Sequence, residues 1–237
     1  MTQPFESFDR IYVINLASRA DRRAEMAKQL SRIGLGFDSA AVRLFGAVRP
    51  ADAGPFPSIG SRGCFMSHLG VLNDAATAGL QKILIVEDDL NFAPDFAQRS
   101  ERLVARIAAP DWGMFYGGHE VAGHPSADNG AADLNPEEPV QTAHFVALQG
   151  PSINAAAAYL AAMLLRPSGD PNGGPMHVDG AYSWFRRAHP HVRTWIAVPP
   201  LGYQRASRTD IHDLRWFDKM PAVREVVSML RRLRNRR

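Results

Sequence analysis

The feature that most constrains this sequence is a short apolar run, residues 83–86, that ends directly in Glu87, Asp88 and Asp89. A run of four apolar residues bounded by charge is typical of a strand buried in a parallel sheet. Open α/β sheets bind their ligands at the carboxyl ends of such strands. The run therefore predicts an α/β fold with a candidate site at its acidic end.

Three adjacent carboxylates repel one another, and a divalent cation relieves that repulsion. Because alternate strand residues point the same way, we expect Glu87 and Asp89 to hold one hard cation, Mg²⁺ or Mn²⁺, while Asp88 faces another group. A solvated acidic strand end is the alternative. The cost of placing charge directly after a buried strand favours the metal site.

The rest of the chain alternates apolar runs with helical periods, which indicates βαβ units. Strands are predicted at residues 11–16, 42–45, 83–86, 112–116, 144–148 and 192–198, and helices at 22–33, 63–78, after Pro94, at 155–165 and at 179–187. Residues 117–139 are rich in Gly, Pro, Asp and Asn and are predicted to form a long loop, a candidate lid. Without a dividing linker, residues 1–220 are expected to be one domain.

Composition excludes several classes of protein. The 46% hydrophobic and 22% charged residues are those of a globular chain. The single cysteine, Cys64, excludes an intramolecular disulfide or a cysteine-built zinc site, and its apolar neighbours predict an inert core thiol. No secretory leader and no membrane-spanning run is recognised, so we expect a cytoplasmic protein.

The net charge of +3 is concentrated at one end, because residues 222–237 carry +5 and the remainder carries −2. A near-neutral body gives no case for a nucleic-acid partner. Residues 221–237 show apolar positions at helical spacing with arginines off that stripe, which predicts a basic amphipathic helix. We expect the apolar stripe of this helix to pack on the domain while the terminal arginines make peripheral contact with an anionic membrane, at the inner face; a terminal helix that only packs on the domain is the alternative.

Arginines follow the first predicted strand. Asn15 lies at the end of that strand, and Arg19 and Arg22 open the next helix. Arginines suit bidentate contacts to phosphate, so this cluster is predicted to bind a diphosphate or nucleotide. For each arginine alone, a charged helix face explains the position better; the phosphate interpretation depends on their clustering beside the acidic run.

The acidic run also resembles the start of a response-regulator receiver domain. That family needs a phospho-accepting Asp at the end of a later strand and a Lys beyond it. Here the downstream Asp133 lies in the predicted loop, and the only lysines are Lys28, Lys82 and Lys219. The receiver resemblance therefore fails on two of its three parts.

Taken in order, five blocks resemble glycosyltransferase family 25, which includes bacterial lipooligosaccharide and collagen galactosyltransferases. The blocks are VINL with a following RADRR, GC-x-x-SH, GLQK followed by EDDL, DW-x-x-x-Y-x-G and the pair Val178-Asp179. The resemblance implies a GT-A-like, Rossmann-type mixed sheet flanked by helices, a nucleotide-sugar donor such as UDP-galactose, and a divalent metal, Mn²⁺ or Mg²⁺. One departure is Ser61, which stands where the family usually has Glu.

The motifs and the resemblance together assign roles to individual residues. Asp179 is predicted to be the catalytic base, with a helix cap as the alternative. The metal ligands are Glu87, Asp89 and a late histidine, His212, which is otherwise a surface residue. Donor contacts are assigned to Asn15, Arg19, Arg22, Ser67, His68, Asp88, Arg205 and Ser207.

These assignments predict a metal-dependent glycosyltransferase. An acceptor hydroxyl, deprotonated by Asp179, would attack the anomeric carbon while the cation neutralises the leaving diphosphate. The family implies inversion, and the expected acceptor is a bacterial surface glycan or lipopolysaccharide-type, lipid-linked glycan. A carboxylate-metal phosphohydrolase and a catalytically silent sugar-nucleotide binding module are the alternatives.

The tail can be tested separately. Deleting residues 231–237 removes five arginines, each attracted to an anionic surface by about 1 kcal/mol. We expect the melting temperature to stay nearly unchanged and co-sedimentation with anionic vesicles at low salt to end. If the intact protein ignores such vesicles, the tail is only a solvated helix end.

Overall fold

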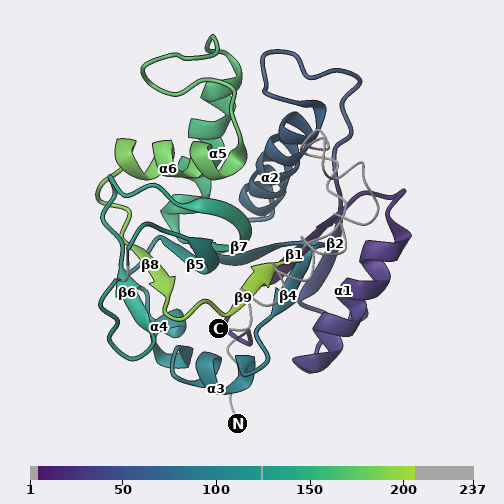
Figure 1. Cartoon of the computed structure of the whole chain (residues 1–237), viewed down its shortest axis with the longest axis vertical. Helices are drawn as coiled ribbons and strands as arrows, with labels where there is room; N and C mark the ends of the chain where they lie inside the picture. Colours follow the sequence, from purple (N-terminus) through teal and green to yellow (C-terminus); the bar gives the residue numbers. More distant parts are fainter. Residues whose placement is uncertain (1–4, 124, 206–237) are drawn as a thin grey trace, which may run out of the picture.

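The computed structural model describes residues 5–123 and 125–205 (Figure 1). Its main sheet has seven strands in the order β2-β1-β3-β7-β5-β8-β6. The strands are β1 (Arg10–Asn15), β2 (Val42–Gly46), β3 (Lys82–Glu87), β5 (Met114–Glu120), β6 (Ala131–Asp133), β7 (Gln141–Gln149) and β8 (Thr194–Ala197). A separate two-stranded sheet pairs β4 (Leu90–Phe92) with β9 (Gly202–Gln204), antiparallel.

Helices cover both faces of the main sheet (Figure 1). On one face lie α2 (Ile59–Thr77), α5 (Pro151–Leu164) and α6 (Val178–Ala188), and on the other α1 (Ala20–Arg32), α3 (Phe96–Glu101) and α4 (Val104–Ala108). Successive β3 residues alternate between the two cores, with Ile83 and Ile85 on the α2 side and Leu84 and Val86 on the α1 side. The predicted α/β fold, a mixed sheet flanked by helices, is confirmed.

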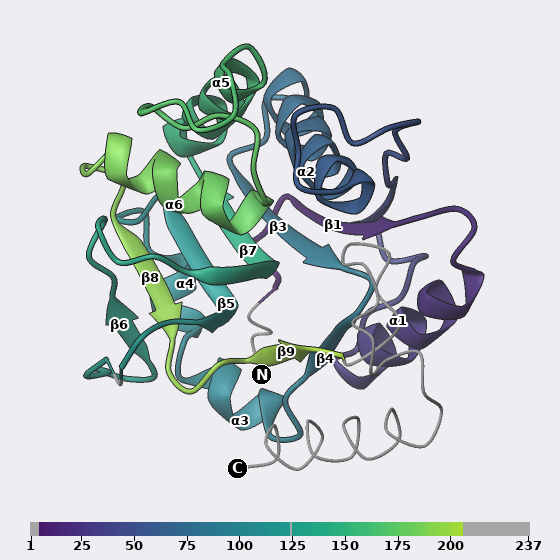
Figure 2. The ribbon, with the colours of Figure 1, turned by 45° about the horizontal axis from the view of Figure 1, so that its top comes forward.

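Strand direction determines which chain segments meet at the site. β1, β2, β3, β5 and β8 run one way, whereas β7 lies antiparallel between β3 and β5. The carboxyl ends of β1 and β3 therefore share one edge of the sheet with the amino end of β7. Figure 2 shows α2 and α6 on the same side of the sheet, above β3 and β7.

The predicted strands and helices are largely confirmed, and the differences have local causes. The long helix α2 begins at Ile59, four residues before the predicted start, because Ser58 and Ser61 form a capping box. The Ser58 Oγ accepts from the Ser61 amide at 3.0 Å, and the Ser61 Oγ accepts from the Ser58 amide at 2.9 Å. Ser61, which stands where the family usually has Glu, thus helps to cap the amino end of α2.

The predicted loop at residues 117–139 is wrong in part. β5 continues through Glu120, and β6 pairs with β8 inside the same stretch. The two glycines that suggested a loop lie within β5, where a Cβ on Gly117 would stand 2.7 Å from the Phe145 ring of β7. A Cβ on Gly118 would instead meet the His144 side chain and stand 3.0 Å from the Gly202 carbonyl, so both glycines are strand residues with close neighbours rather than turn residues.

The described residues include no helix that is both long and apolar enough to cross a membrane. The predicted tail, residues 221–237, and the candidates Ser207 and His212 lie outside the described residues.

The capping box is open to a direct test. Ser58→Ala removes an N-cap acceptor, which costs about 1 kcal/mol and lowers the melting temperature of a domain of this size by roughly 2–4 °C. Chemical and thermal denaturation measure the change. Ser168→Ala, at an exposed position, is the matched control and should have no effect; equal effects of both variants would contradict the role of the box.

Candidate active site

The acidic turn, Glu87 to Asp89, divides its three carboxylates among different neighbours. β3 ends at Glu87, and Asp88 and Asp89 form a turn before β4 begins. The alternation of β3 directs Glu87 to the α2 face and Asp88 to the α1 face. Each carboxylate consequently has its own set of partners.

Asp88 is held by groups from β1, α1 and the segment after β9. Its Oδ2 accepts from the Asn15 amide nitrogen at 2.7 Å, and its Oδ1 lies 3.1 Å from the Arg22 guanidinium. The Arg205 guanidinium donates to the Asp88 carbonyl at 3.1 Å. Burial raises the pKa of Asp88, although the contacts with Asn15 and Arg22 lower it.

Asp89 is the least compensated member of the acidic turn. Its Oδ2 accepts from the Gln204 amide nitrogen at 3.2 Å and lies 3.5 Å from Arg22. Its Oδ1 is buried and has no hydrogen-bond partner among the described residues. Burial, followed by the charge of Glu87, raises the pKa of Asp89 to about 7. A buried oxygen with no donor, beside other carboxylates, suits a hard cation.

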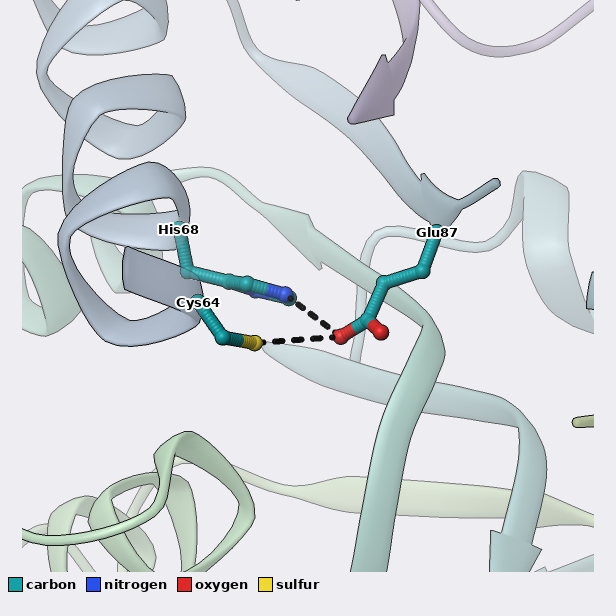
Figure 3. A group of neighbouring side chains, drawn as sticks. All are labelled: Cys64, His68 and Glu87. Atoms are coloured by element: carbon teal, nitrogen blue, oxygen red, sulfur yellow. Dashed lines mark hydrogen bonds and ion pairs between the residues drawn. The ribbon is translucent and has the colours of Figure 1, made fainter. Parts of the chain in front are cut away.

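Glu87 contacts two side chains of α2 (Figure 3). Its Oε1 lies 3.4 Å from the Cys64 Sγ and 3.2 Å from the His68 Nε2. Burial raises the pKa of Glu87, but the contact with His68, together with His144 and Cys64, lowers it by more, so that the pKa lies below its usual range. Burial is the main cause that raises the pKa of the Cys64 thiol, and the negative charge of Glu87 raises it further.

His68 links the acidic turn to α6. Its ring is fully buried, and its Nδ1 lies 3.2 Å from the Tyr182 hydroxyl. Asp179 lies three residues before Tyr182 on α6, at a spacing that shares one helix face. The Asp179 carboxylate accepts from the Thr142 amide at 3.1 Å and from the Gly180 amide at 2.8 Å. The amino end of β7 thereby holds Asp179 in place.

A cavity of about 260 Å³ opens beside Asp179. Its lining includes Pro139 and Val140 before β7 and Trp184 and Arg187 on α6. The Arg187 guanidinium lies 5.6 Å from the Trp184 ring centroid and forms an ion pair with Glu137 at 2.8 Å. An aromatic side chain with charged and hydroxyl neighbours is a suitable surface for a sugar.

The predicted donor residues divide into two groups. Asn15, Arg22, Asp88 and Arg205 meet at the acidic turn, and His68 joins them through Glu87. Arg19 instead pairs with Asp21 at 2.8 Å on the surface.

Ser67 has a different neighbourhood from the other donor candidates. Its hydroxyl donates to the Gly63 carbonyl at 2.6 Å and accepts from the Val48 amide at 2.8 Å. A Cβ on Gly63 would stand 2.7 Å from the Val48 carbonyl. Gly63 and Ser67 therefore fasten α2 to the preceding loop, whereas Cys64 and His68 face the acidic turn.

The predicted alternation of the metal ligands along one strand is not observed. It required Glu87 and Asp89 to lie on one strand, but β3 ends at Glu87 and Asp89 contacts Arg22 of α1 instead. The pairing of Glu87 and Asp89 on one cation stays a prediction. The predicted partner His212 lies outside the described residues.

The sequence analysis missed Cys64, Gln204 and Tyr182 as members of this region. Cys64 and His68 are four residues apart on a helix, a spacing that places both on one face and could have indicated them. Gln204 reaches Asp89 through the β4–β9 pairing, for which the sequence gives no pattern.

Comparison with known proteins agrees with the resemblance. Residues 8–115 match the model of glycosyltransferase family 25, described as an LPS biosynthesis protein. Procollagen galactosyltransferase 1 of Danio rerio is 30% identical over 131 residues, and the inactive glycosyltransferase 25 family member 3 of Homo sapiens is 31% identical over 131 residues. Each match covers 48% of this chain and 22% of the relative, so the chain spans about a fifth of the length of these relatives.

One solved structure is that of a glycosyltransferase involved in the glycosylation of the major capsid of PBCV-1. The alignment covers 84% of this chain and 94% of the chain in that structure. Its TM-score is 0.48 at 12% sequence identity.

Residues 8–115 therefore match glycosyltransferase family 25 by sequence, and the predicted resemblance is confirmed. This stretch contains the first strand block, the Cys64 and His68 block and the acidic turn. Asp179, the cavity beside it and the β9 segment lie beyond it.

The raised pKa of Asp89 predicts a pH dependence of stability. The unfolded chain releases this proton near pH 4, whereas the folded protein keeps it until about pH 7. Between these values deprotonation favours the unfolded state, so wild-type stability falls relative to Asp89→Asn as pH rises. Urea unfolding in the presence of a chelator measures the free energy of unfolding of both proteins. The difference should change in favour of Asp89→Asn from pH 4 to pH 7 and stay constant above pH 7.

Asp95→Asn provides the control for that series. Asp95 pairs with Arg99 at the surface, where the arginine lowers the pKa of the carboxyl. Relative to the wild type, the Asp95→Asn variant should gain no stability as pH rises. A flat difference between wild type and Asp89→Asn would contradict the raised pKa.

Proposed function

We propose that this protein is a metal-dependent glycosyltransferase that moves a sugar from a nucleotide-sugar donor to a glycan acceptor with inversion. The observation that carries the proposal is the buried, unpartnered Asp89 oxygen, set among carboxylates and arginines at the sheet edge. The match of residues 8–115 to family 25 supports a role in glycosyl transfer.

A divalent cation, Mn²⁺ or Mg²⁺, fits the acidic turn. Glu87 and Asp89 would hold it, since the Asp89 Oδ1 lacks a donor and both carboxylates offer the oxygen ligands that hard cations prefer. Such a cation, when bound, neutralises negative charge on the diphosphate leaving group. Asp88 is already committed to Asn15 and Arg22 and positions these groups instead.

The donor diphosphate would lie against the arginines around the acidic turn. Arg22 and Arg205 approach it from α1 and from the end of β9, so guanidinium groups from two elements converge there. Arginine binds phosphate with paired hydrogen bonds, which fixes orientation as well as charge. Asn15 would keep Asp88 in place during binding.

Asp179 is proposed to take the proton from the acceptor hydroxyl. Its two oxygens are oriented by the Thr142 and Gly180 amides, and each retains a lone pair for an acceptor. It lines the cavity with Trp184, which would hold the acceptor sugar. The helix-cap alternative does not account for the cavity.

The finer assignments extend this proposal. The donor is proposed to be UDP-galactose, since one relative is named a procollagen galactosyltransferase. The acceptor is proposed to be a lipopolysaccharide-type surface glycan of a bacterial cell, in keeping with the description of the family as an LPS biosynthesis protein. The basic tail would hold the enzyme at the cytoplasmic membrane face.

A catalytically silent donor-binding module is the second candidate, because one relative is named inactive and Ser61 departs from the family pattern. Binding of donor without turnover on any acceptor would favour it. Release of phosphate or nucleotide without any acceptor would instead favour the phosphohydrolase.

The first test concerns the metal. Asp89→Asn should abolish Mn²⁺-dependent binding of UDP-sugars, measured by calorimetry, while the variant remains folded. Asp95→Asn, an exposed carboxylate on another element, is the matched control and should bind as the wild type does. Unchanged Mn²⁺-dependent binding in Asp89→Asn would overturn the metal assignment.

The second test concerns the base. Asp179→Asn keeps the shape of the side chain but cannot accept a proton, so turnover should fall by roughly 10²-fold or more with donor affinity nearly unchanged. Asp170→Asn, in the loop before α6, is the control. A loss of donor binding as large as the loss of rate would make Asp179 a binding residue.

A further inference from the structure

Three side chains of different ligand chemistry meet beside the acidic turn. The Cys64 Sγ, the His68 ring nitrogen and a Glu87 carboxylate oxygen lie within 4.8 Å of one another (Figure 3). Cys64 and His68 share one face of α2 because they are four residues apart. Glu87 comes from β3, so a helix and a strand together position the group.

Two of the three distances match the edges of a small coordination shell. Tetrahedral Zn²⁺ with bonds of about 2.3 Å to sulfur and about 2.0–2.1 Å to nitrogen and oxygen places S and O about 3.5 Å apart, and N and O about 3.3 Å apart. The observed separations are 3.4 Å for Cys64 Sγ to Glu87 Oε1 and 3.2 Å for His68 Nε2 to the same oxygen. The third pair, the Cys64 sulfur and the His68 ring nitrogen, lies within 4.8 Å.

The His68 ring is also held from its other side. Its Nδ1 lies 3.2 Å from the Tyr182 hydroxyl, and the two rings meet edge to face. A metal-binding histidine usually has its second nitrogen hydrogen-bonded in this way, which fixes the ring orientation. The Tyr182 hydroxyl can accept from Nδ1–H, which leaves the Nε2 lone pair for an ion.

We propose that Cys64, His68 and Glu87 form a site for Zn²⁺ that is separate from the hard-cation site of the acidic turn and shares only Glu87 with it. A sulfur, an imidazole nitrogen and one carboxylate oxygen suit Zn²⁺ and not Mg²⁺ or Mn²⁺, which prefer oxygen ligands. On binding, the Cys64 thiol gives its proton to solvent and no redox change occurs. Three protein ligands leave the fourth position to water.

Co²⁺ provides the test, because it replaces Zn²⁺ and a thiolate ligand to Co²⁺ gives an intense near-ultraviolet absorption band. The full chain contains one cysteine, so any such band reports Cys64. Metal-free protein should develop the band on addition of Co²⁺, and one equivalent of Zn²⁺ should remove it. Absence of the band in the wild type would overturn the proposal.

Variants separate this site from other metal binding. Cys64→Ser should lose the band and weaken Zn²⁺ binding by more than about 100-fold, because even an outer-shell partner contributes 10–100-fold. Tyr182→Phe should keep the band with affinity lowered roughly 10-fold. Zinc affinity that is unchanged in Cys64→Ser would overturn the proposal.

Two controls are available in the same chain. His191→Ala removes an exposed histidine and should change neither band nor affinity. Asp89→Asn should keep the cobalt band although it loses Mn²⁺-dependent donor binding, and a band lost in Asp89→Asn would show that the two sites are one. Neither measurement needs a donor or an acceptor, so its result is independent of the proposed transfer reaction.

Discussion

The structure around the site depends on the electrostatic cost of ending a buried strand in three carboxylates. Asp88 is compensated by Arg22 and Asn15, and Glu87 by hydrogen bonds from α2. Asp89 is compensated only in part, which leaves its pKa raised. Because an uncompensated buried charge destabilises the folded state, α1, α2 and β9 must all approach this turn, and their arrangement follows from it.

The acidic turn, α1 and the first strands could be predicted from the sequence because each has a local signal. An apolar run of four residues followed by charge identifies β3, and helical periodicity identifies α1. The β4–β9 pairing could not be predicted, since each strand has only three residues and their contact joins segments more than a hundred residues apart. The contacts of Gln204 with Asp89 and of Arg205 with Asp88 could not be predicted for the same reason. The glycines of β5 could not be recognised as strand residues, because the side chains of β7 that leave no room for a Cβ there come from a distant part of the sequence.

The reversal of β7 explains how two distant parts of the chain come to act on one region. β7 runs against β3, so its first residues lie beside the last residues of β3. Thr142 there holds Asp179, and Tyr182 on the same helix reaches His68. Asp179, the proposed base, and the carboxylates are therefore linked through hydrogen bonds between α6, α2 and β3 rather than through a flexible loop.

The same arrangement limits what a relative can tell about this chain. The family match ends at residue 115, before β7, α6 and the cavity that contains Asp179 begin. Two proteins can share the acidic turn and its arginines and still differ in the residues that line the cavity beside Asp179, because those residues come from a separate stretch of sequence. Likeness over residues 8–115 therefore informs on the carboxylates and the arginines near them, whereas the cavity proposed to bind the acceptor has to be compared through the segment that corresponds to residues 137–187 of this chain.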